Sequence, residues 1–415
     1  MPAFNFQITP SGNPKFEPYI AVNLLQPNIM VAVSTDTTSG VPQTGLYRSL
    51  DGGANWSVTL LPLPTGFTGA EAAAVCYKFP TTFIVTAHVF PGEESGTTFA
   101  YISTDNGQTF GTPFIVGPGY GTYINNDETN LAVDNSQVSP FLGNVYVVYN
   151  HQFNVDNFSG SAAFLSRSGD GGNTFSNTTL LSNEKDTVER PDVTAGITGI
   201  IYAGWITTNQ GSTFYIKRSF DGGVTFEANP ITVSNVVLVP QVLPVPGYGF
   251  RVLTFANLAT DRSNGPNSGT IYAVWQDNRL GYSDVFLSKS VDRGATWSTP
   301  VSITGAPQGS QNFFPAIDVD PLLGVVNVVY YTNRLTNFNL DVFIARSIDG
   351  GNTFTNQRVT TTSFNPNGTS PTPAPLIGDY IDVDSVAPGG YIATWADTRT
   401  GSLTIFAGYN TDPVA

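Results

Sequence analysis

SGDGGNTF, residues Ser168–Phe175, combines serine, aspartate, glycine and an aromatic residue at fixed spacing. The same pattern, Ser-x-Asp-x-Gly-x-x-aromatic, recurs as SLDGGANW (Ser49–Trp56), STDNGQTF (Ser103–Phe110), SFDGGVTF (Ser219–Phe226), SVDRGATW (Ser290–Trp297) and SIDGGNTF (Ser347–Phe354). In a turn, a carboxylate accepts backbone N–H bonds, glycine adopts a positive φ, and the aromatic ring packs back onto the sheet. We therefore predict six equivalent turns whose aspartates are structural: Asp51, Asp105, Asp170, Asp221, Asp292 and Asp349.

A second periodic element precedes the turns. It is a short strand that usually ends in Asp or Asn, as in PYIAVN (18–23), TNLAVD (129–134), ANLATD (256–261), PAIDVD (315–320) and DYIDVD (379–384), with PDVTAG (191–196) as a degenerate copy. An apolar second strand follows each copy, and a third strand, the turn and a fourth strand come next. Four such strands with a hairpin between the third and fourth make one propeller blade.

The number of blades follows from the two ends of the chain. Six blades contain the turn motif, whereas residues 376–410 supply three more strands without it and residues 4–10 resemble an isolated fourth strand. Joining the ends completes a seventh blade and removes an exposed sheet edge. We therefore predict an all-β, seven-bladed propeller of four-stranded antiparallel blades, in one domain over residues 1–415. Six blades are the fallback.

Composition excludes several classes of partner. The 415 residues contain 17 Lys+Arg against 31 Asp+Glu, a net charge of −14, and no basic stripe that could neutralise nucleic-acid phosphates. No run reaches the ~18 apolar residues needed to span a bilayer, so we expect no membrane insertion. The N-terminus lacks the pattern of a signal peptide, although the composition favours an extracellular or surface-associated protein.

The repeated turn is identified as the Asp box, also called the bacterial neuraminidase repeat. Through it the whole chain resembles the sialidase-like propeller superfamily, most closely over RVLTFANLATDRSNGPNSGTIYAVWQDNR (251–279) and FFPAIDVDPLLGVVNVVYYTNR (313–334). The resemblance implies a propeller, a carbohydrate or glycoconjugate partner and an extracellular setting.

Function in such folds usually lies on the face opposite the Asp-box turns, around the central pocket. Three second strands end there in an arginine: Arg279 (WQDNR), Arg334 (YYTNR) and Arg399 (WADTR). The resemblance to sialidases implies a three-arginine clamp for a substrate carboxylate, which guanidinium groups bind in a bidentate manner. The alternative is local pairing, for example with Asp277 and Asp397 two residues earlier.

The loops that enter the blades supply further candidates on this face. These are Asp127, Glu128, Glu189, Arg190, Arg251, Asp379 and Tyr380. Glycosidases place two acids across the scissile bond, and the resemblance implies a tyrosine nucleophile polarised by a glutamate. Tyr380 with Glu128 or Glu189, and Asp379 beside it, are the catalytic candidates, while Arg190 and Arg251 are candidates for substrate binding. Solvated loop charges or ion pairs between blades are the alternative.

Two aspartates break the repeat. The middle of the inner strand is usually Ala, but it becomes Asp318 and Asp382 in the last two blades. Unpaired buried carboxylates are costly, so the substitution predicts a shared proton, arginine partners or a bound cation. Calcium suits oxygen ligands, and a structural calcium is therefore one interpretation of this pair. We expect no other cofactor to be required.

The two histidines, His88 and His151, both follow second strands. Two histidines in different blades do not by themselves make a zinc site. His151 is a candidate for substrate binding, and His151 or Tyr123 could serve as the base of a polysaccharide lyase.

The sequence leads to one hypothesis about function and two alternatives. A sialidase-like propeller would recognise a glycan and, if it is an enzyme, act as a glycoside hydrolase. The first alternative is a non-catalytic structural or adhesive surface module, and the second is a polysaccharide lyase.

Overall fold

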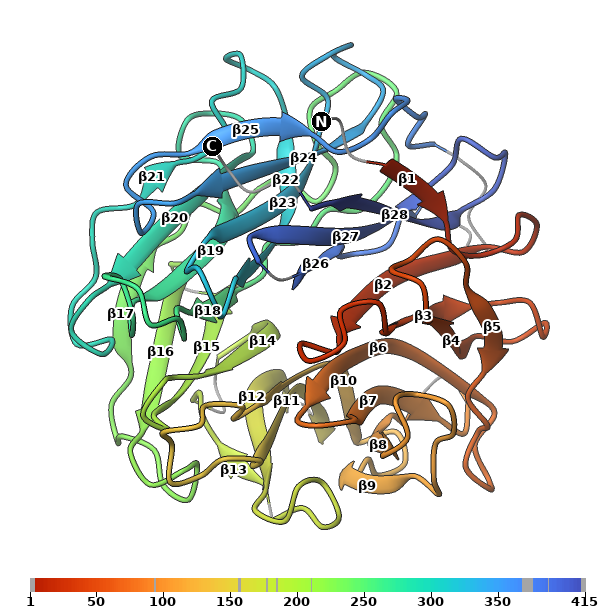
Figure 1. Ribbon diagram of the computed structural model, residues 1–415, viewed down its shortest axis with the longest axis vertical. Coiled ribbons are helices and arrows are strands. Elements are labelled where there is room, and N and C mark those ends of the chain that lie inside the picture. Colours follow the sequence, from red (N-terminus) through yellow and green to blue (C-terminus); the bar gives the residue numbers. More distant parts are fainter. Residues whose placement is uncertain are drawn as a thin grey trace.

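The computed structural model describes residues 4–92, 95–155, 158–176, 178–183, 186–209, 211–367, 376–386 and 388–411. These residues form seven four-stranded antiparallel sheets arranged in a ring (Figure 1). Residues of the seven inner strands line a cavity at the centre of the ring, which we call the channel. Within them there is no helix, and hence none long and apolar enough to cross a membrane. The predicted all-β, seven-bladed propeller is confirmed.

Each blade runs from an inner strand at the channel to an outer strand at the rim. Blades 1 to 3 contain β2 (Lys15–Val22), β3 (Met30–Asp36), β4 (Gln43–Ser49), β5 (Ser57–Leu60), β6 (Gly69–Lys78), β7 (Thr82–Phe90), β8 (Thr97–Ser103), β9 (Phe114–Gly117), β10 (Ile124–Val133), β11 (Val145–Val155), β12 (Phe158–Ser168) and β13 (Thr179–Leu180). Blades 4 to 6 contain β14 (Val188–Ala195), β15 (Ile201–Thr207), β16 (Thr213–Ser219), β17 (Ile231–Asn235), β18 (Asn257–Thr260), β19 (Ile271–Asp277), β20 (Asp284–Ser290), β21 (Val301–Ser302), β22 (Asn312–Val319), β23 (Val326–Thr332), β24 (Asp341–Ser347) and β25 (Thr355–Arg358).

Blade 7 closes the ring with strands from both ends of the chain. Its order is β1-β28-β27-β26, formed by β1 (Phe4–Gln7), β26 (Asp382–Val386), β27 (Gly390–Asp397) and β28 (Thr404–Asn410). In the antiparallel pairing of β1 with β28, Phe4 lies opposite Tyr409 and Gln7 opposite Phe406. The ring can therefore form only when the two ends of the chain have met.

The six Asp-box segments form turns with a common hydrogen-bond pattern. In the turn after β12, the Ser168 hydroxyl donates to Asp170 (2.7 Å), and the Gly172 N–H donates to Ser168 Oγ (2.8 Å). Asp170 also accepts bonds from the backbone N–H (2.9 Å) and hydroxyl (2.7 Å) of Thr174, and these bonds lower its pKa to about 2. Gly172 has φ of +105°, which side chains with a Cβ rarely adopt. The spacing of the motif thus follows from the bonds that the turn makes.

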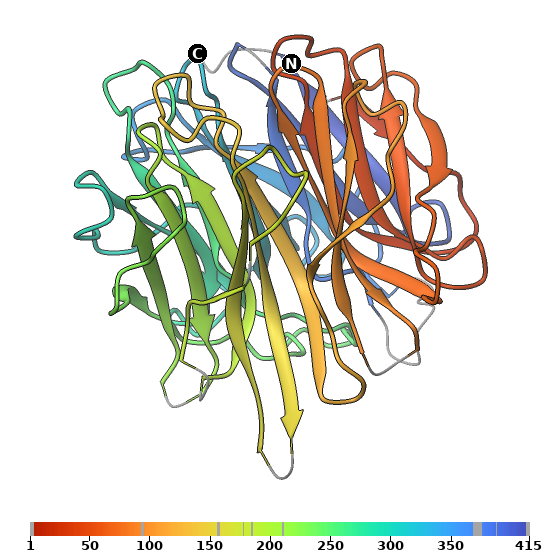
Figure 2. The ribbon, with the colours of Figure 1, turned by 90° about the horizontal axis from the view of Figure 1, so that it is seen from below.

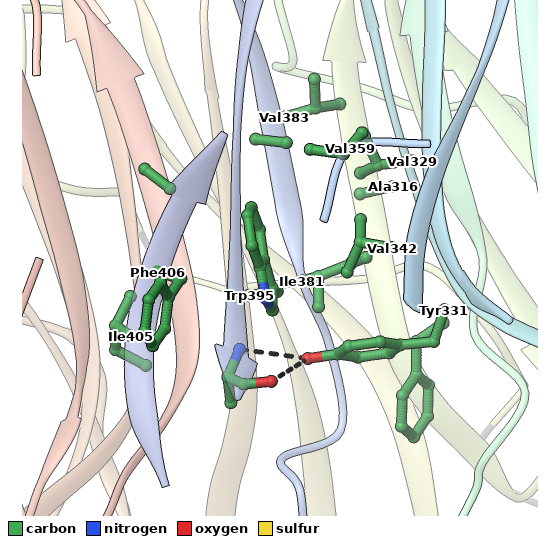
Figure 3. Packing of buried hydrophobic residues seen from close by; sticks show 14 of the residues in the cluster. Ala316, Val329, Tyr331, Val342, Val359, Ile381, Val383, Trp395, Ile405 and Phe406 are labelled. Carbon is green, nitrogen blue, oxygen red and sulfur yellow. Dashed lines mark hydrogen bonds between the residues drawn. The ribbon is translucent and has the colours of Figure 1, made fainter. Parts of the chain in front are cut away.

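The second strand of a blade packs between two neighbouring blades, which explains its continuous apolar sequence. The strands β3, β15, β19, β23 and β27 are buried along their whole length. In β27, the indole of Trp395 stacks on Phe406 with 6.2 Å between ring centroids. Figure 3 shows these rings among the buried side chains at the boundary between blades 6 and 7.

A tyrosine hydroxyl joins these two blades. The Tyr331 hydroxyl, from β23, accepts a bond from the Ala396 N–H (3.0 Å) and donates to the Ala396 carbonyl (2.9 Å), as Figure 3 shows. The inner strand β26 pairs with β27 only as far as Thr394, so Ala396 lies beyond that ladder. The hydroxyl therefore takes the place of a strand partner across the boundary between the blades.

We expect Tyr331→Phe to lower the free energy of unfolding by about 1–3 kcal/mol, because it leaves a buried N–H and carbonyl without their partner. Chemical denaturation monitored by tryptophan fluorescence measures the change. Tyr409→Phe, at a half-buried ring on β28 of blade 7, is the control and should cost less than about 0.5 kcal/mol. Equal costs for the two variants would show that the bridge to Ala396 contributes no stability.

Candidate functional site

The inner strands begin on the face opposite the Asp-box turns. In blade 1, Val22 at the end of β2 pairs with Met30, which in turn pairs with Ser49 at the start of the turn. The other end of β2, with Glu17, must therefore lie at the opposite face. Figure 2 shows that β11 and β12 extend furthest on this face, away from the two chain termini.

Five inner strands contain a β-bulge where they enter the ring. The pairing register shifts in β2, β6, β10, β14 and β22, where each bulge leaves two residues unpaired. The first residue of each unpaired pair has a positive φ: Glu17 (60°), Ala72 (48°), Glu128 (51°), Arg190 (23°) and Phe314 (49°). Positive φ is uncommon for residues other than glycine, and bulges are enriched beside active sites, where they redirect side chains. The repeated bulge identifies this end of the channel, which we call the mouth, as the candidate site.

Side chains of neighbouring blades accept hydrogen bonds from the backbone N–H groups of two bulges. The Arg190 N–H donates to the Glu128 carboxylate of the preceding blade (2.7 Å). The Phe314 N–H donates to the Gln276 side chain (3.0 Å) of the preceding blade in the same way. Glu128 is thus both a charged group at the mouth and a structural acceptor for the next blade.

Acidic side chains from several blades meet at the mouth. The set consists of Glu17, Glu71, Asp127, Glu128, Glu189 and Asp379, which influence one another electrostatically. Arg251 forms a two-point ion pair with Asp379, and its side chain remains 52% exposed whereas that of Asp379 is 6% exposed. The structure therefore brings together Glu128, Glu189, Arg251 and Asp379 of the predicted residues.

These carboxyl groups differ in their protonation. Burial raises the pKa of Glu189 to about 7, and burial together with the nearby Glu189 charge raises that of Glu128 well above its usual range. Burial alone would raise the pKa of Asp127, but His88 beside it lowers the pKa below its usual value. The mouth thus holds protonated and ionised carboxyl groups side by side at neutral pH.

Below the mouth, Arg190 lines the channel, and its guanidinium group lies among three aromatic rings. Its guanidinium carbon lies 4.3 Å from the ring centroid of Tyr380, 5.3 Å from that of Tyr19 and 5.6 Å from that of Phe255. Arg190 is 3% exposed and Tyr380 5% exposed, and burial raises the pKa of the Tyr380 hydroxyl well above its usual value. These two predicted residues therefore lie together, but both are buried and neither is on the open surface.

Asp318 and Asp382 line this channel, which encloses about 190 Å³. Asp382 accepts a bond from the Ile20 N–H of blade 1 (2.9 Å), and Asp318 accepts one from the Ser385 hydroxyl of blade 7. Both carboxylates thus bond across a boundary between blades. A calcium ion at this pair stays a prediction.

A larger cleft of about 690 Å³ opens beside blade 3. Its lining is polar apart from two aromatic side chains and consists of Thr122, Tyr123, Asn125, Asn150, Gln152, Phe153, Asn154, Ser159, Gly160, Ser161, Thr187 and Glu189. Tyr123 is 51% exposed and stacks with Tyr120, which is 69% exposed, with ring centroids 6.3 Å apart. Glu189 thus belongs both to this cleft and to the mouth.

His88 sits between two of the mouth carboxylates. Its Nδ1 lies 3.2 Å from an Asp127 oxygen and 3.5 Å from a Glu71 oxygen, and its Nε2 lies 3.0 Å from Asn125 Oδ1. Burial would lower the pKa of His88, but Asp127 and Glu71 raise it to about 10. His151 lies apart from this group, with Nδ1 2.6 Å from Asn126 Oδ1 and its ring against Phe164.

The three second-strand arginines are each engaged within their own blade. Arg279 pairs with Asp277 (2.5 Å) and Arg399 with Asp397 (2.5 Å), both two residues earlier in the chain. Arg334 donates to the Tyr330 hydroxyl (2.7 Å), and its guanidinium lies over Phe343. The structure shows the local pairing that the sequence offered as the alternative and does not join the three groups in a contact with one another.

Several residues at the mouth lay outside the sequence prediction. Glu17 precedes PYIAVN just as Glu128 precedes TNLAVD and Arg190 precedes PDVTAG, so the position before each inner-strand motif carried the signal. Glu71 and His88 are directly opposite each other in the pairing of β6 with β7. Blade 2 lacks a recognisable inner-strand motif, and its register was therefore not apparent from the sequence.

Comparison with known proteins supports the fold. No protein-family model matches the sequence, and no curated protein matches it. A lectin from Burkholderia pseudomallei matches with a TM-score of 0.62 and 13% identity, over 97% of this chain and 99% of the lectin. A Hadza microbial sialidase has a TM-score of 0.52 and 15% identity, over 93% of this chain and 74% of that chain. An α-L-arabinofuranosidase from Fusarium graminearum has a TM-score of 0.53 and 13% identity, over 80% of this chain and 92% of that chain.

This chain is similar in fold to sugar-related propellers. At identities of 13–15%, the likeness to the lectin, the sialidase and the arabinofuranosidase establishes the propeller alone. The chemistry of the site has to be argued from its own residues.

A buried aspartate in the channel makes stability depend on pH. Asp192 accepts bonds from the Leu258 N–H (2.6 Å) and the Asn130 amide (2.7 Å), and burial raises its pKa to about 6. Because this folded-state pKa exceeds the unfolded value, ionisation costs more in the folded protein. The contribution of Asp192 to stability is therefore lost as the pH rises from about 4 to about 6.

We expect Asp192→Asn to remove this pH dependence. As the pH rises from 4 to 7, wild type should lose about 3 kcal/mol of its free energy of unfolding relative to the variant. This figure follows from the roughly two-unit difference between the folded and unfolded pKa of Asp192, at about 1.4 kcal/mol per unit. Denaturant titrations at several pH values measure the difference, whatever the constant cost of the substitution itself. A difference that does not vary with pH would contradict the assignment.

Proposed function

We propose that this propeller binds a glycan in the cleft beside blade 3 and hydrolyses it with Glu189 as the general acid. The observation that carries the proposal is the lining of the cleft, which combines amides, hydroxyls, an exposed tyrosine and one carboxyl group. The propeller fold shared with a lectin, a sialidase and an arabinofuranosidase supports it.

The polar lining suits a sugar. Asn125, Asn150, Gln152 and Asn154 present amide groups, each of which both donates and accepts hydrogen bonds, as sugar hydroxyls also do. Amides can satisfy a polyhydroxylated ligand without the desolvation cost of a full charge. Among residues of the described cleft, Glu189 is the sole ionisable carboxyl group, which leaves the binding surface mostly neutral.

The tyrosines at the rim supply an apolar surface. Tyr120 and Tyr123 stack and are both more than half exposed, although aromatic rings are normally buried. An exposed, rigid aromatic surface next to a polar cleft is well suited to pack against the apolar face of a sugar ring. We assign Tyr123, which lines the cleft itself, as the residue that carries this contact.

Hydrolysis needs one protonated and one ionised carboxyl group on either side of the bond. Glu189, with a pKa of about 7, is well matched to donate a proton near neutral pH. We assign Asp379, which interacts electrostatically with Glu189 from the mouth, as the ionised partner. Burial raises the pKa of Asp379, and the two-point contact with Arg251 opposes this rise and favours the charged form. Glu128, bound to the Arg190 N–H, acts as a positioning residue beside Glu189.

Binding without hydrolysis is the second candidate. Glu128 and Asp379 are both engaged in structural bonds, to the Arg190 N–H and to Arg251 respectively. A propeller that uses its carboxylates in this way would act as a lectin-like module, and the cleft would serve recognition alone.

The test separates the two candidates. The purified protein is screened on a glycan array and incubated with the same glycans, sialylated and uronic-acid glycans included, followed by mass spectrometry of the products. We expect a released sugar with added water, activity that falls above about pH 7 as Glu189 ionises, and loss of turnover in Glu189→Gln with binding retained. Binding with no released product would favour the lectin-like module.

Tyr123→Ala should weaken glycan binding about tenfold, because burial of one face of an aromatic ring contributes about 1–2 kcal/mol. The matched control is Phe220→Ala, which removes an exposed aromatic ring next to an Asp-box aspartate on the opposite face, and Glu227→Gln on that face controls for Glu189→Gln. If both aromatic variants bind as wild type does, the cleft is not the site. If no glycan binds at all, the proposed function is wrong.

A further inference from the structure

Three metal-ligating groups converge on one side of the mouth. Glu71 on β6 pairs directly across the sheet with His88 on β7, and Asp127 reaches them from β10 of the next blade. One ligand atom from each residue lies within 4.8 Å of the others. An imidazole nitrogen with two carboxylate oxygens is a donor set that suits first-row divalent metals.

The imidazole of His88 supplies the observation that points to a ligand. His88 is 4% exposed, and among the described residues its Nδ1 has no hydrogen-bond partner. This nitrogen nevertheless faces oxygens of Asp127 at 3.2 Å and Glu71 at 3.5 Å. A buried nitrogen that faces two carboxylates needs a positive charge, which is supplied either by a proton on Nδ1 itself or by a metal ion that replaces this proton.

The other ring nitrogen is fixed by a chain of hydrogen bonds. The Asn125 amide nitrogen donates to Gln152 Oε1 (3.1 Å), which turns Asn125 Oδ1 toward His88 Nε2 (3.0 Å). An amide oxygen only accepts, so Nε2 must carry the proton and Nδ1 is left with its lone pair in the neutral ring. Metal-bound histidines in proteins are held by such a bond from the second nitrogen.

We propose that Glu71, His88 and Asp127 bind one divalent transition-metal ion, Zn²⁺ or Mn²⁺, through His88 Nδ1 and the two carboxylates. Ligand atoms about 2.1 Å from a tetrahedral Zn²⁺ lie about 3.4 Å apart. The two separations from Nδ1, 3.2 and 3.5 Å, are close to this value. Ca²⁺ takes six to eight oxygen ligands and suits this nitrogen-containing set less well.

The ion would leave room for a further ligand. The Glu71 side chain is 38% exposed and that of Asp127 26% exposed, so the site opens toward the mouth. Asn125 and Gln152, which orient His88, also line the cleft beside blade 3. The same two side chains therefore support the proposed metal site and form part of the cleft wall. The metal site itself does not depend on the proposed glycan function.

The experiment measures the binding of metal ions alone to the full chain. After chelator treatment, the protein is dialysed against Zn²⁺, Mn²⁺, Ca²⁺ or Mg²⁺, and bound metal is counted by mass spectrometry. We expect one Zn²⁺ or Mn²⁺ per chain, with affinity reduced at least tenfold in His88→Gln and in Glu71→Gln. Asn125→Ala should reduce the affinity about 10–100-fold through the hydrogen bond to His88.

The chain has two histidines, which gives a matched control. His151→Gln should bind Zn²⁺ as wild type does, and long-range ¹H–¹⁵N spectra of histidine-labelled protein should show Zn²⁺ shifting the Nδ1 resonance of His88. Because Glu71 is partly exposed, Glu71→Gln keeps the test valid if the His88 variant fails to fold.

Three outcomes would overturn the proposal. They are no stoichiometric binding of Zn²⁺ or Mn²⁺, equal binding by wild type and Glu71→Gln, and preferential binding of Ca²⁺ or Mg²⁺. In the first case, His88 is a doubly protonated imidazolium that bridges the two carboxylates. A negative result here would not affect the glycan proposal, because that proposal is tested separately by glycan binding in Tyr123→Ala and by turnover in Glu189→Gln.

Discussion

The bulge at the start of the inner strands is the constraint on which the site depends. Each positive φ at a residue other than glycine costs about 1–3 kcal/mol, and each buried N–H needs a partner. In this ring the neighbouring blade supplies that partner, as Glu128 does for Arg190 and Gln276 for Phe314. Closure of the ring therefore stabilises the same backbone that points the charged side chains into the mouth. Assembly of the blades and formation of the site are consequences of one set of bonds.

The repeat made the fold predictable, because turn chemistry is local. The six Asp-box turns each need a serine, an aspartate and a glycine at fixed spacing. The C-terminal end supplies three strands of a blade, and the N-terminal end supplies the missing fourth strand. The inner strand of blade 7 was placed less well, since it begins at Asp382 and not at Asp379. Here Tyr331 of the neighbouring blade bonds the backbone of Ala396, and such a contact between distant residues leaves no mark in the local pattern.

The site was predictable only in part, since a bulge is a property of two paired strands. Glu128, Glu189, Arg190 and Asp379 stood out as charges in the blade-entry loops. Glu17 occupies the same place as Glu128 and Arg190, directly before an inner-strand motif. Glu71 occupies the place of Glu189, but blade 2 has no recognisable motif, so only the pairing of β6 with β7 shows it. By contrast, Arg279 and Arg399 repeat at one position because each pairs with an aspartate of its own blade. In a repeat protein, a residue that recurs in register is best explained by the blade, whereas one that departs from the repeat calls for another explanation.

The departures gather at the mouth and have one electrostatic consequence. Six carboxyl groups, Glu17, Glu71, Asp127, Glu128, Glu189 and Asp379, meet there with Arg190, Arg251 and His88 as the nearby cations. Full ionisation of such a group would be strongly unfavourable in a partly buried setting, so some members keep a proton or gain a positive partner. Glu189 meets this demand with a raised pKa, Asp379 with Arg251, and Asp127 with His88. The bulges direct acidic side chains from several blades toward one opening, and this places many carboxyl groups close together. The proposed proton donor, Glu189, and the proposed metal site at His88 both follow from this arrangement.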